Sequence, residues 1–133
     1  MVVDTSAVIA IFLSEPDMNV LAERIAVDDS PMMSVANILE CSMVLRARKL
    51  VSDTDAEAWL DAFLAASSIH PMPVSQEQMV LARQAHRLYG KGTGHKAQLN
   101  FGDCFAYALA KALDVPLLWK GADFAHTDLR RAL

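Results

Sequence analysis

Residues 2–7 have the sequence Val-Val-Asp-Thr-Ser-Ala, in which a short apolar run ends in polar residues. This pattern predicts a buried β-strand over Val2–Asp4 whose carboxyl end carries polar side chains. Further short strands are predicted over 31–34, 69–74 and 115–119. Because 69–74 contains two prolines, which cannot donate backbone hydrogen bonds, we expect that strand near an edge of the sheet.

Stretches with a helical spacing of apolar residues separate these strands. Capping residues mark several helix starts, for example Ser34 and Asn100. The predicted helices cover residues 7–13, 17–26, 34–49, 52–67, 75–89 and 101–113. Strands that alternate with helices imply an α/β fold with one parallel sheet covered on both faces. No linker divides the chain, so we expect a single domain over 1–133.

The composition excludes several classes of protein. Of the 133 residues, 53% are apolar and the mean hydropathy is +0.23, which provides a buried core and rules out a disordered chain. The net charge of −4, from 12 basic and 16 acidic residues, argues against a protein that holds nucleic acid through overall positive charge. Two cysteines without a C-x-x-C pair, and no signal peptide or membrane span, predict a protein of the reducing cytoplasm without membrane contact.

Four acidic residues stand where carboxylates are costly. Asp4 ends the first predicted strand and Asp123 closely follows the last one, and the carboxyl ends of parallel strands meet at one edge of a sheet. Glu40 and Asp103 lie on helix stripes of otherwise apolar residues, so we expect both side chains to face the interior. Any one of them is explained as a capping or ion-paired acid, but together they indicate a shared metal site.

The ligand chemistry favours a hard cation. A set of carboxylates alone suits Mg²⁺ or Mn²⁺, whereas Zn²⁺ prefers cysteine or histidine ligands. Cys41 and Cys104 each follow one of these acids, but one helical step turns a side chain by about 100°, so we expect both thiols to pack in the core. Carboxylates that hold divalent ions are a common apparatus for hydrolysing phosphodiester bonds.

Four stretches resemble the PIN-domain ribonucleases, and most closely the VapC toxins of prokaryotic toxin–antitoxin pairs: Val2–Ala7, Ser34–Glu40, Phe101–Ala110 and Leu117–Phe124. The resemblance implies a three-layer α/β/α domain with a short, mainly parallel central sheet. It also implies an Mg²⁺- or Mn²⁺-dependent endoribonuclease toxin, in which the catalytic and metal-binding cluster consists of Asp4, Glu40, Asp103 and Asp123. The implied partners are an RNA substrate, a VapB-type antitoxin, a second copy of the chain in a homodimer, and operator DNA contacted only through the antitoxin.

Two further residues are candidates near this cluster. Ser6 would hydrogen-bond a carboxylate or a metal-bound water, or alternatively cap the first helix. Asp128 would supply an outer carboxylate, or alternatively cap a short final helix.

Residues 78–102 contain no acid and carry several basic side chains, which we call the basic strip: Arg83, Arg87, Lys91 and Lys96. The strip is a candidate path for RNA, or alternatively a solvated helix face followed by a mobile loop. Lys120, close to Asp123, is another candidate phosphate contact. His86 and His95 are more simply explained as surface residues than as proton donors.

Two other readings of the acids remain open. A non-catalytic binding module would use its acidic pocket to dock a basic segment of a partner. A doubly wound phosphatase or phosphoaspartate receiver fits less well, because Ser6 stands where such a phosphatase needs a second aspartate. We also expect exposed apolar surface on the first helix, 7–13, and over Trp59–Leu64, which a partner would cover.

Overall fold

The computed structural model describes residues 1–133 as six helices and four strands. The strands are β1 (Val2–Val3), β2 (Met32–Ser34), β3 (His70–Met72) and β4 (Leu117–Leu118). The helices are α1 (Thr5–Phe12), α2 (Met18–Ala26), α3 (Val35–Arg48), α4 (Asp53–Ala66), α5 (Gln76–Tyr89) and α6 (Phe101–Leu113). None of the helices is both long and apolar enough to cross a membrane.

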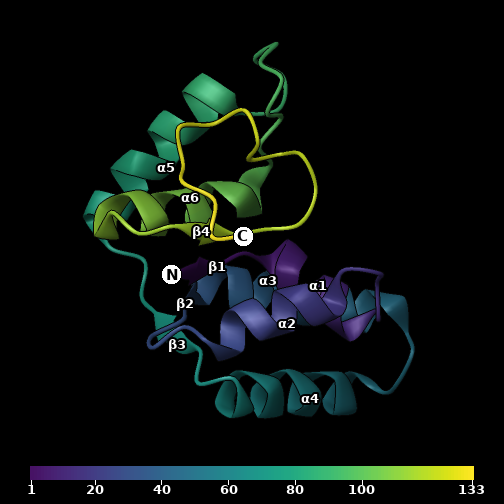
Figure 1. The fold of residues 1–133 in the computed structure, drawn as a ribbon. Coiled ribbons are helices and arrows are strands. Elements are labelled where there is room, and N and C mark those ends of the chain that lie inside the picture. The colour runs from purple at the N-terminus through teal and green to yellow at the C-terminus, as the bar shows by residue number, and fades with distance from the viewer.

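The strands form one parallel sheet in the order β3-β2-β1-β4. Figure 1 shows α5 and α6 on one side of this sheet and α1, α2 and α3 on the other, with α4 packed outside α3. The predicted α/β fold with helices on both faces is therefore confirmed. The strand 69–74, predicted at an edge, is β3 at an edge.

Alternating side chains of the short strands supply two separate cores. Val3 and Leu118 are paired across the sheet and face the core made with α1–α4, whereas Val2 and Leu117 face the core made with α5 and α6. All four side chains are fully buried. Two-residue strands suffice here because every side chain on them is covered by helices.

The beginning of α1 differs from its prediction. The helix starts at Thr5, because the Asp4 side chain accepts a hydrogen bond from the backbone N–H of Ser6 and is the N-cap. The alternative prediction that Ser6 caps this helix is therefore wrong. The predicted exposure of the helix is wrong as well, since Ala7, Val8, Ile9 and Ala10 are buried under neighbouring helices.

The interior face of α3 also differs from its prediction. Asn37, Cys41 and Leu45, one turn apart, are its buried residues, while Met43 on the stripe of Glu40 is 56% exposed. Glu40 therefore lies at the border between interior and surface. The prediction for α6 is confirmed, because Asp103 and the residues on its stripe are buried.

Candidate active site

The candidate site lies at the carboxyl end of the sheet, beside its central strand. The chain passes from β1 to β2 and β3 on one side, and then returns to place β4 on the other side of β1. At such a switch point the loops that follow neighbouring strands diverge and leave a crevice. Asp4 directly follows β1, and Asp123 follows β4.

Asp4 is 1% exposed and has two differently placed carboxylate oxygens. Oδ2 accepts hydrogen bonds from the backbone N–H of Ser6 at 2.9 Å and from the Ser6 hydroxyl at 2.6 Å. Oδ1 is buried and has no hydrogen-bond partner. Burial raises the pKa of Asp4 to about 6, with a further contribution from Glu40 and against the hydrogen bonds from Ser6. A buried carboxylate oxygen without a partner is costly and indicates that a cation belongs there.

Asp103 is placed by the first turn of α6. Its Oδ2 accepts a hydrogen bond from the backbone N–H of Asn100 at 2.8 Å, and the Asn100 side chain accepts one from the N–H of Asp103 at 2.9 Å. This capping box leaves Asp103 7% exposed. Burial, together with the negative charges of Asp4, Asp123 and Glu40, raises the pKa of Asp103 to about 7.

Glu40 reaches the site from α3. Its Oε2 accepts hydrogen bonds from the Thr5 hydroxyl at 2.5 Å and from the Asn37 amide at 3.2 Å, and its carboxylate lies against Gly102. Sequence reasoning missed these three neighbours. Their only signals were the position of Thr5 beside Asp4, that of Gly102 beside Asp103, and the one-turn spacing of Asn37 and Glu40.

The four carboxylates are suitable ligands for a hard cation, although their side chains do not all point toward one position in this structure. Carboxylate oxygens are the ligands that Mg²⁺ and Mn²⁺ prefer. The negative charges of the other three acids raise the pKa of Asp103, so the four carboxylates interact electrostatically. In the conformation of the structure, no group of three acids, histidines or cysteines could hold one ion. Glu40 is held by Thr5 and Asn37 through Oε2, and Asp123 is exposed, so ion binding would need the Asp123 side chain to turn toward the other acids.

The two thiols are structural. Cys41 and Cys104 are buried and unpaired. Burial raises the pKa of Cys41 to about 12 and that of Cys104 to about 11, so both stay protonated at neutral pH. Their prediction as core residues is confirmed.

Three other predicted residues have definite contacts. The Ser6 hydroxyl accepts a hydrogen bond from the backbone N–H of Lys120 at 3.0 Å, in addition to donating to Asp4. The Lys120 ammonium forms ion pairs with Glu15 and Asp17, so it is not a free phosphate contact. Asp128 accepts hydrogen bonds from Tyr107 at 2.7 Å and from Lys111 at 2.9 Å, and it caps no helix. Asp128 therefore ties the C-terminal segment to α6.

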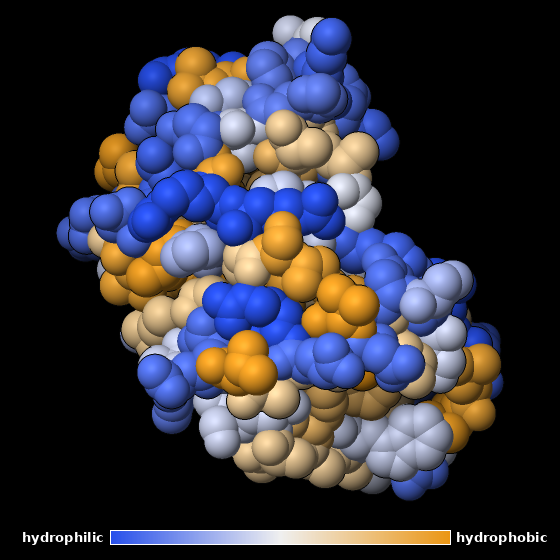
Figure 2. Space-filling view, viewed as in Figure 1, coloured by the Kyte–Doolittle hydropathy of each residue, from blue (hydrophilic) through white to orange (hydrophobic).

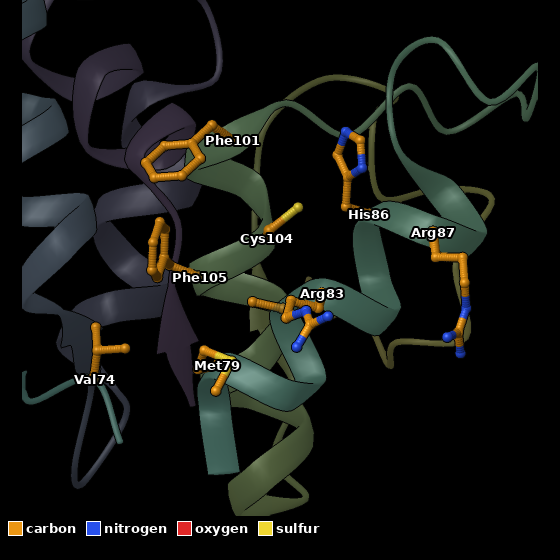
Figure 3. Close-up of a pocket in the computed structure, with 9 residues that line it drawn as sticks. Val74, Met79, Arg83, His86, Arg87, Phe101, Cys104 and Phe105 are labelled. Atoms are coloured by element: carbon orange, nitrogen blue, oxygen red, sulfur yellow. The ribbon is translucent and has the colours of Figure 1, made fainter. Parts of the chain in front are cut away.

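All four residues of the basic strip are exposed, and none has an ion-pair partner. Arg83 and Arg87 line an apolar cavity of about 720 Å³ between α5 and α6, together with Met79, Phe101 and Phe105. Figure 3 shows Phe101 and Phe105 along α6, with Arg83 and Met79 opposite them on α5. Phe101 and Phe105 also line a groove that contains Glu40, so this cavity adjoins the acidic site.

The chain matches known proteins over its whole length. The model of the PIN domain matches residues 1–129. The chain is 44% identical to VapC ribonuclease Mb0625 of Mycobacterium bovis over 133 residues, which are 100% of this chain and 98% of the relative. It superposes on VapC20 of Mycobacterium tuberculosis, described as a sarcin–ricin loop cleaving toxin, with a TM-score of 0.72, 17% identity and coverage of 96% and 95%. VapBC2 of Rickettsia felis, bound to a DNA fragment from its promoter, gives a TM-score of 0.72, 16% identity and coverage of 98% and 94%.

Proposed function

The chain belongs to the PIN-domain family and is a VapC-type toxin ribonuclease of a toxin–antitoxin system, and on this basis we propose that it cleaves RNA internally with Mg²⁺ or Mn²⁺ held by Asp4, Glu40, Asp103 and Asp123. The observation that supports the metal site is the buried Oδ1 of Asp4, which has no hydrogen-bond partner. The negative charges of Asp4 and of two further acids also raise the pKa of Asp103. Metal-free carboxylates in this arrangement repel one another, and a divalent cation relieves that repulsion.

Each acid has a distinct part in the proposed site. Asp4 and Asp103 are held by caps of α1 and α6, so their oxygens are fixed before any ligand arrives. Glu40 and Asp123 would complete the set from α3 and from the segment after β4. A bound ion would supply positive charge that orients the scissile phosphate and activates water. The chain itself supplies the fixed oxygens and excludes competing donors, since both nearby thiols stay protonated.

Replacement of single acids tests this proposal. Asp4→Asn and Asp103→Asn keep the size of the side chain and one acceptor oxygen, but each removes a negative charge. We expect both variants to fold, to lose Mn²⁺ binding measured by calorimetry, and to lose RNA cleavage. Asp128→Asn is the matched control, because its contacts lie with Tyr107 and Lys111. Wild-type cleavage by purified Asp4→Asn would refute the metal-site assignment.

The RNA would approach along the basic strip. The exposed arginines and lysines of α5 and of the following loop have no acidic partners. Arg83 and Arg87 line the cavity in Figure 3, and Phe101 of that cavity also lines the groove over Glu40. These residues would bind phosphates on either side of the scissile bond. The local positive charge explains how a protein of net charge −4 would bind RNA.

Exposed apolar side chains support protein partners beside the site. Leu39 is 59% exposed, Met43 56% and Phe101 81%, and all three line a groove over Glu40. Figure 2 shows hydrophobic patches between hydrophilic residues on one face of the molecule. Apolar patches of this kind commonly mark interfaces, here with a VapB-type antitoxin and with a second copy of the chain. Such a complex would bind operator DNA through the antitoxin, as the complex from Rickettsia felis is bound to promoter DNA.

Light scattering of the toxin alone tests the homodimer. A dimer is the expected result, whereas a monomer at micromolar concentration would leave the apolar surface to the antitoxin.

We place the protein in the cytoplasm, where its two free thiols would stay reduced and RNA is present.

The separation of the carboxylates supports one alternative function. In this structure no three acids are placed so that they could hold one ion. The pocket would therefore also suit a basic side chain of a partner, as in a non-catalytic binding module. Metal titration separates the two functions. A binding module would show no Mn²⁺ site, and it would leave RNA intact at every metal concentration.

A further inference from the structure

The carboxylate of Glu40 is held by residues of three helices. Thr5 on α1 and Asn37 on α3 donate hydrogen bonds to Oε2, and Gly102 on α6 lies against the same carboxylate. We propose that Asn37, Thr5 and Gly102 are positioning residues that fix the Glu40 carboxylate relative to Asp4 and Asp103. The proposal rests on the metal site proposed above, and it assigns the residues that determine where the Glu40 carboxylate of that site lies.

Asn37 joins the three helices. Its side chain is 0% exposed, and its Nδ2 group lies 3.2 Å from Glu40 Oε2, 3.3 Å from Thr5 Oγ1 and 3.0 Å from the carbonyl oxygen of Gly102. Its own Oδ1 is buried without a partner. A buried amide left partly unsatisfied is costly for stability, and an apolar side chain of similar size would pack without that cost. The position of Asn37 is thus better explained by the orientation of Glu40 than by stability.

Gly102 provides the space that Glu40 occupies. A Cβ atom at this position would lie 2.1 Å from Oε1 and 2.4 Å from Cδ of Glu40, and the three nearest atoms all belong to that carboxylate. The closest collision would therefore be with a flexible side chain rather than with the backbone. An alanine at position 102 would let the protein fold but displace the Glu40 carboxylate.

Metal affinity is the first test. We expect Gly102→Ala, Asn37→Ala and Thr5→Val to bind Mn²⁺ roughly 10- to 100-fold more weakly than wild type, the usual effect of losing a residue that orients a ligand. Thr5→Ser keeps the hydroxyl and should retain wild-type affinity. Asn19→Ala, at an exposed position of α2, is the control for loss of an amide. Wild-type affinity of Gly102→Ala and Thr5→Val would overturn the proposal.

Thermal unfolding without any metal is the second test. In a double-mutant cycle, Gly102→Ala is introduced into wild type and into Glu40→Ala, which removes the colliding carboxylate. We expect the change in Tm to be more favourable in the Glu40→Ala background by about 3 °C or more, because only wild type suffers the collision. Equal changes in both backgrounds would refute the positioning role. Failure of wild type to bind Mn²⁺ would instead refute the metal site, while this cycle would still decide the positioning of Glu40.

Discussion

The Ser6 hydroxyl donates a 2.6 Å hydrogen bond to Oδ2 of Asp4. The oxygen of this hydroxyl also accepts a hydrogen bond from the backbone N–H of Lys120, in the segment after β4. One side chain thus connects the ends of the two adjacent strands β1 and β4. It holds the Asp4 carboxylate with one oxygen engaged and the other left for a ligand.

Ser6→Ala should lower the free energy of unfolding by about 1–2 kcal/mol, because the variant leaves the backbone N–H of Lys120 without its acceptor. The pKa of Asp4 should also rise, since the lost hydrogen bond favours its charged form. Denaturant unfolding and NMR titration of the carboxyl carbon measure the two effects. Ser42→Ala, whose hydroxyl bonds an exposed glutamate, is the control and should change stability by less than about 0.5 kcal/mol.

The raised pKa values of Asp4 and Asp103 predict how stability depends on pH. Their folded-state values of about 6 and about 7 lie above the ordinary value of 3.8, so the folded state retains protons that the unfolded state has released. Metal-free protein should therefore lose stability, on the order of a few kcal/mol, as the pH rises from about 4 to about 7. Added Mg²⁺ should raise Tm more at pH 7.5 than at pH 5, because binding requires the deprotonated carboxylates.

The double variant Asp4→Asn/Asp103→Asn is the control for this pH dependence. Its stability should vary much less between pH 4 and pH 7, and Mg²⁺ should not raise its Tm. An unchanged pH profile in this variant would assign the effect to other groups.

The basic strip should govern the salt dependence of RNA binding. Arg83→Ala/Arg87→Ala removes two cations, so the slope of log affinity against log salt should flatten by about 1.4 for a single-stranded RNA. Fluorescence anisotropy with a labelled RNA and a non-cleaving Asp4→Asn background measures this slope. Arg48→Ala, exposed near the end of α3, is the matched control. An unchanged slope would place the RNA elsewhere.

Asp28 should stabilise the fold only above acidic pH. Partial burial alone would raise its pKa, but the N-terminal ammonium at 3.1 Å and Arg24 lower it. A group whose pKa is lowered in the folded state stabilises the fold at pH values above its unfolded-state pKa of 3.8. This contribution disappears as the pH falls through the folded-state pKa. Asp28→Asn should therefore cost about 1–2 kcal/mol at pH 7 and less at pH 3. A constant difference between the two pH values would contradict this origin.

Much of the fold could be predicted because its signals are local. Ser34 and Asn100 each accept a backbone hydrogen bond at the start of the helix that they were predicted to cap. Their neighbours along the chain are sufficient to specify such caps. The burial of α1 could not be predicted in this way, because an apolar helix looks the same whether other helices or a partner protein cover it.

The sequence by itself determined the order of strands and helices and the four acids, since apolar periodicity and strand-end polarity are properties of consecutive residues. Tertiary structure alone decided which side chains meet: Lys120 pairs with Glu15 and Asp17, and Asn37 reaches the carbonyl of Gly102. It also left Glu40 at the edge of the interior with Thr5 and Asn37 as its partners. Apart from the contact between Asn37 and Glu40, which are one helical turn apart, these contacts join residues far apart in the chain, so they depend on how the helices pack across the sheet.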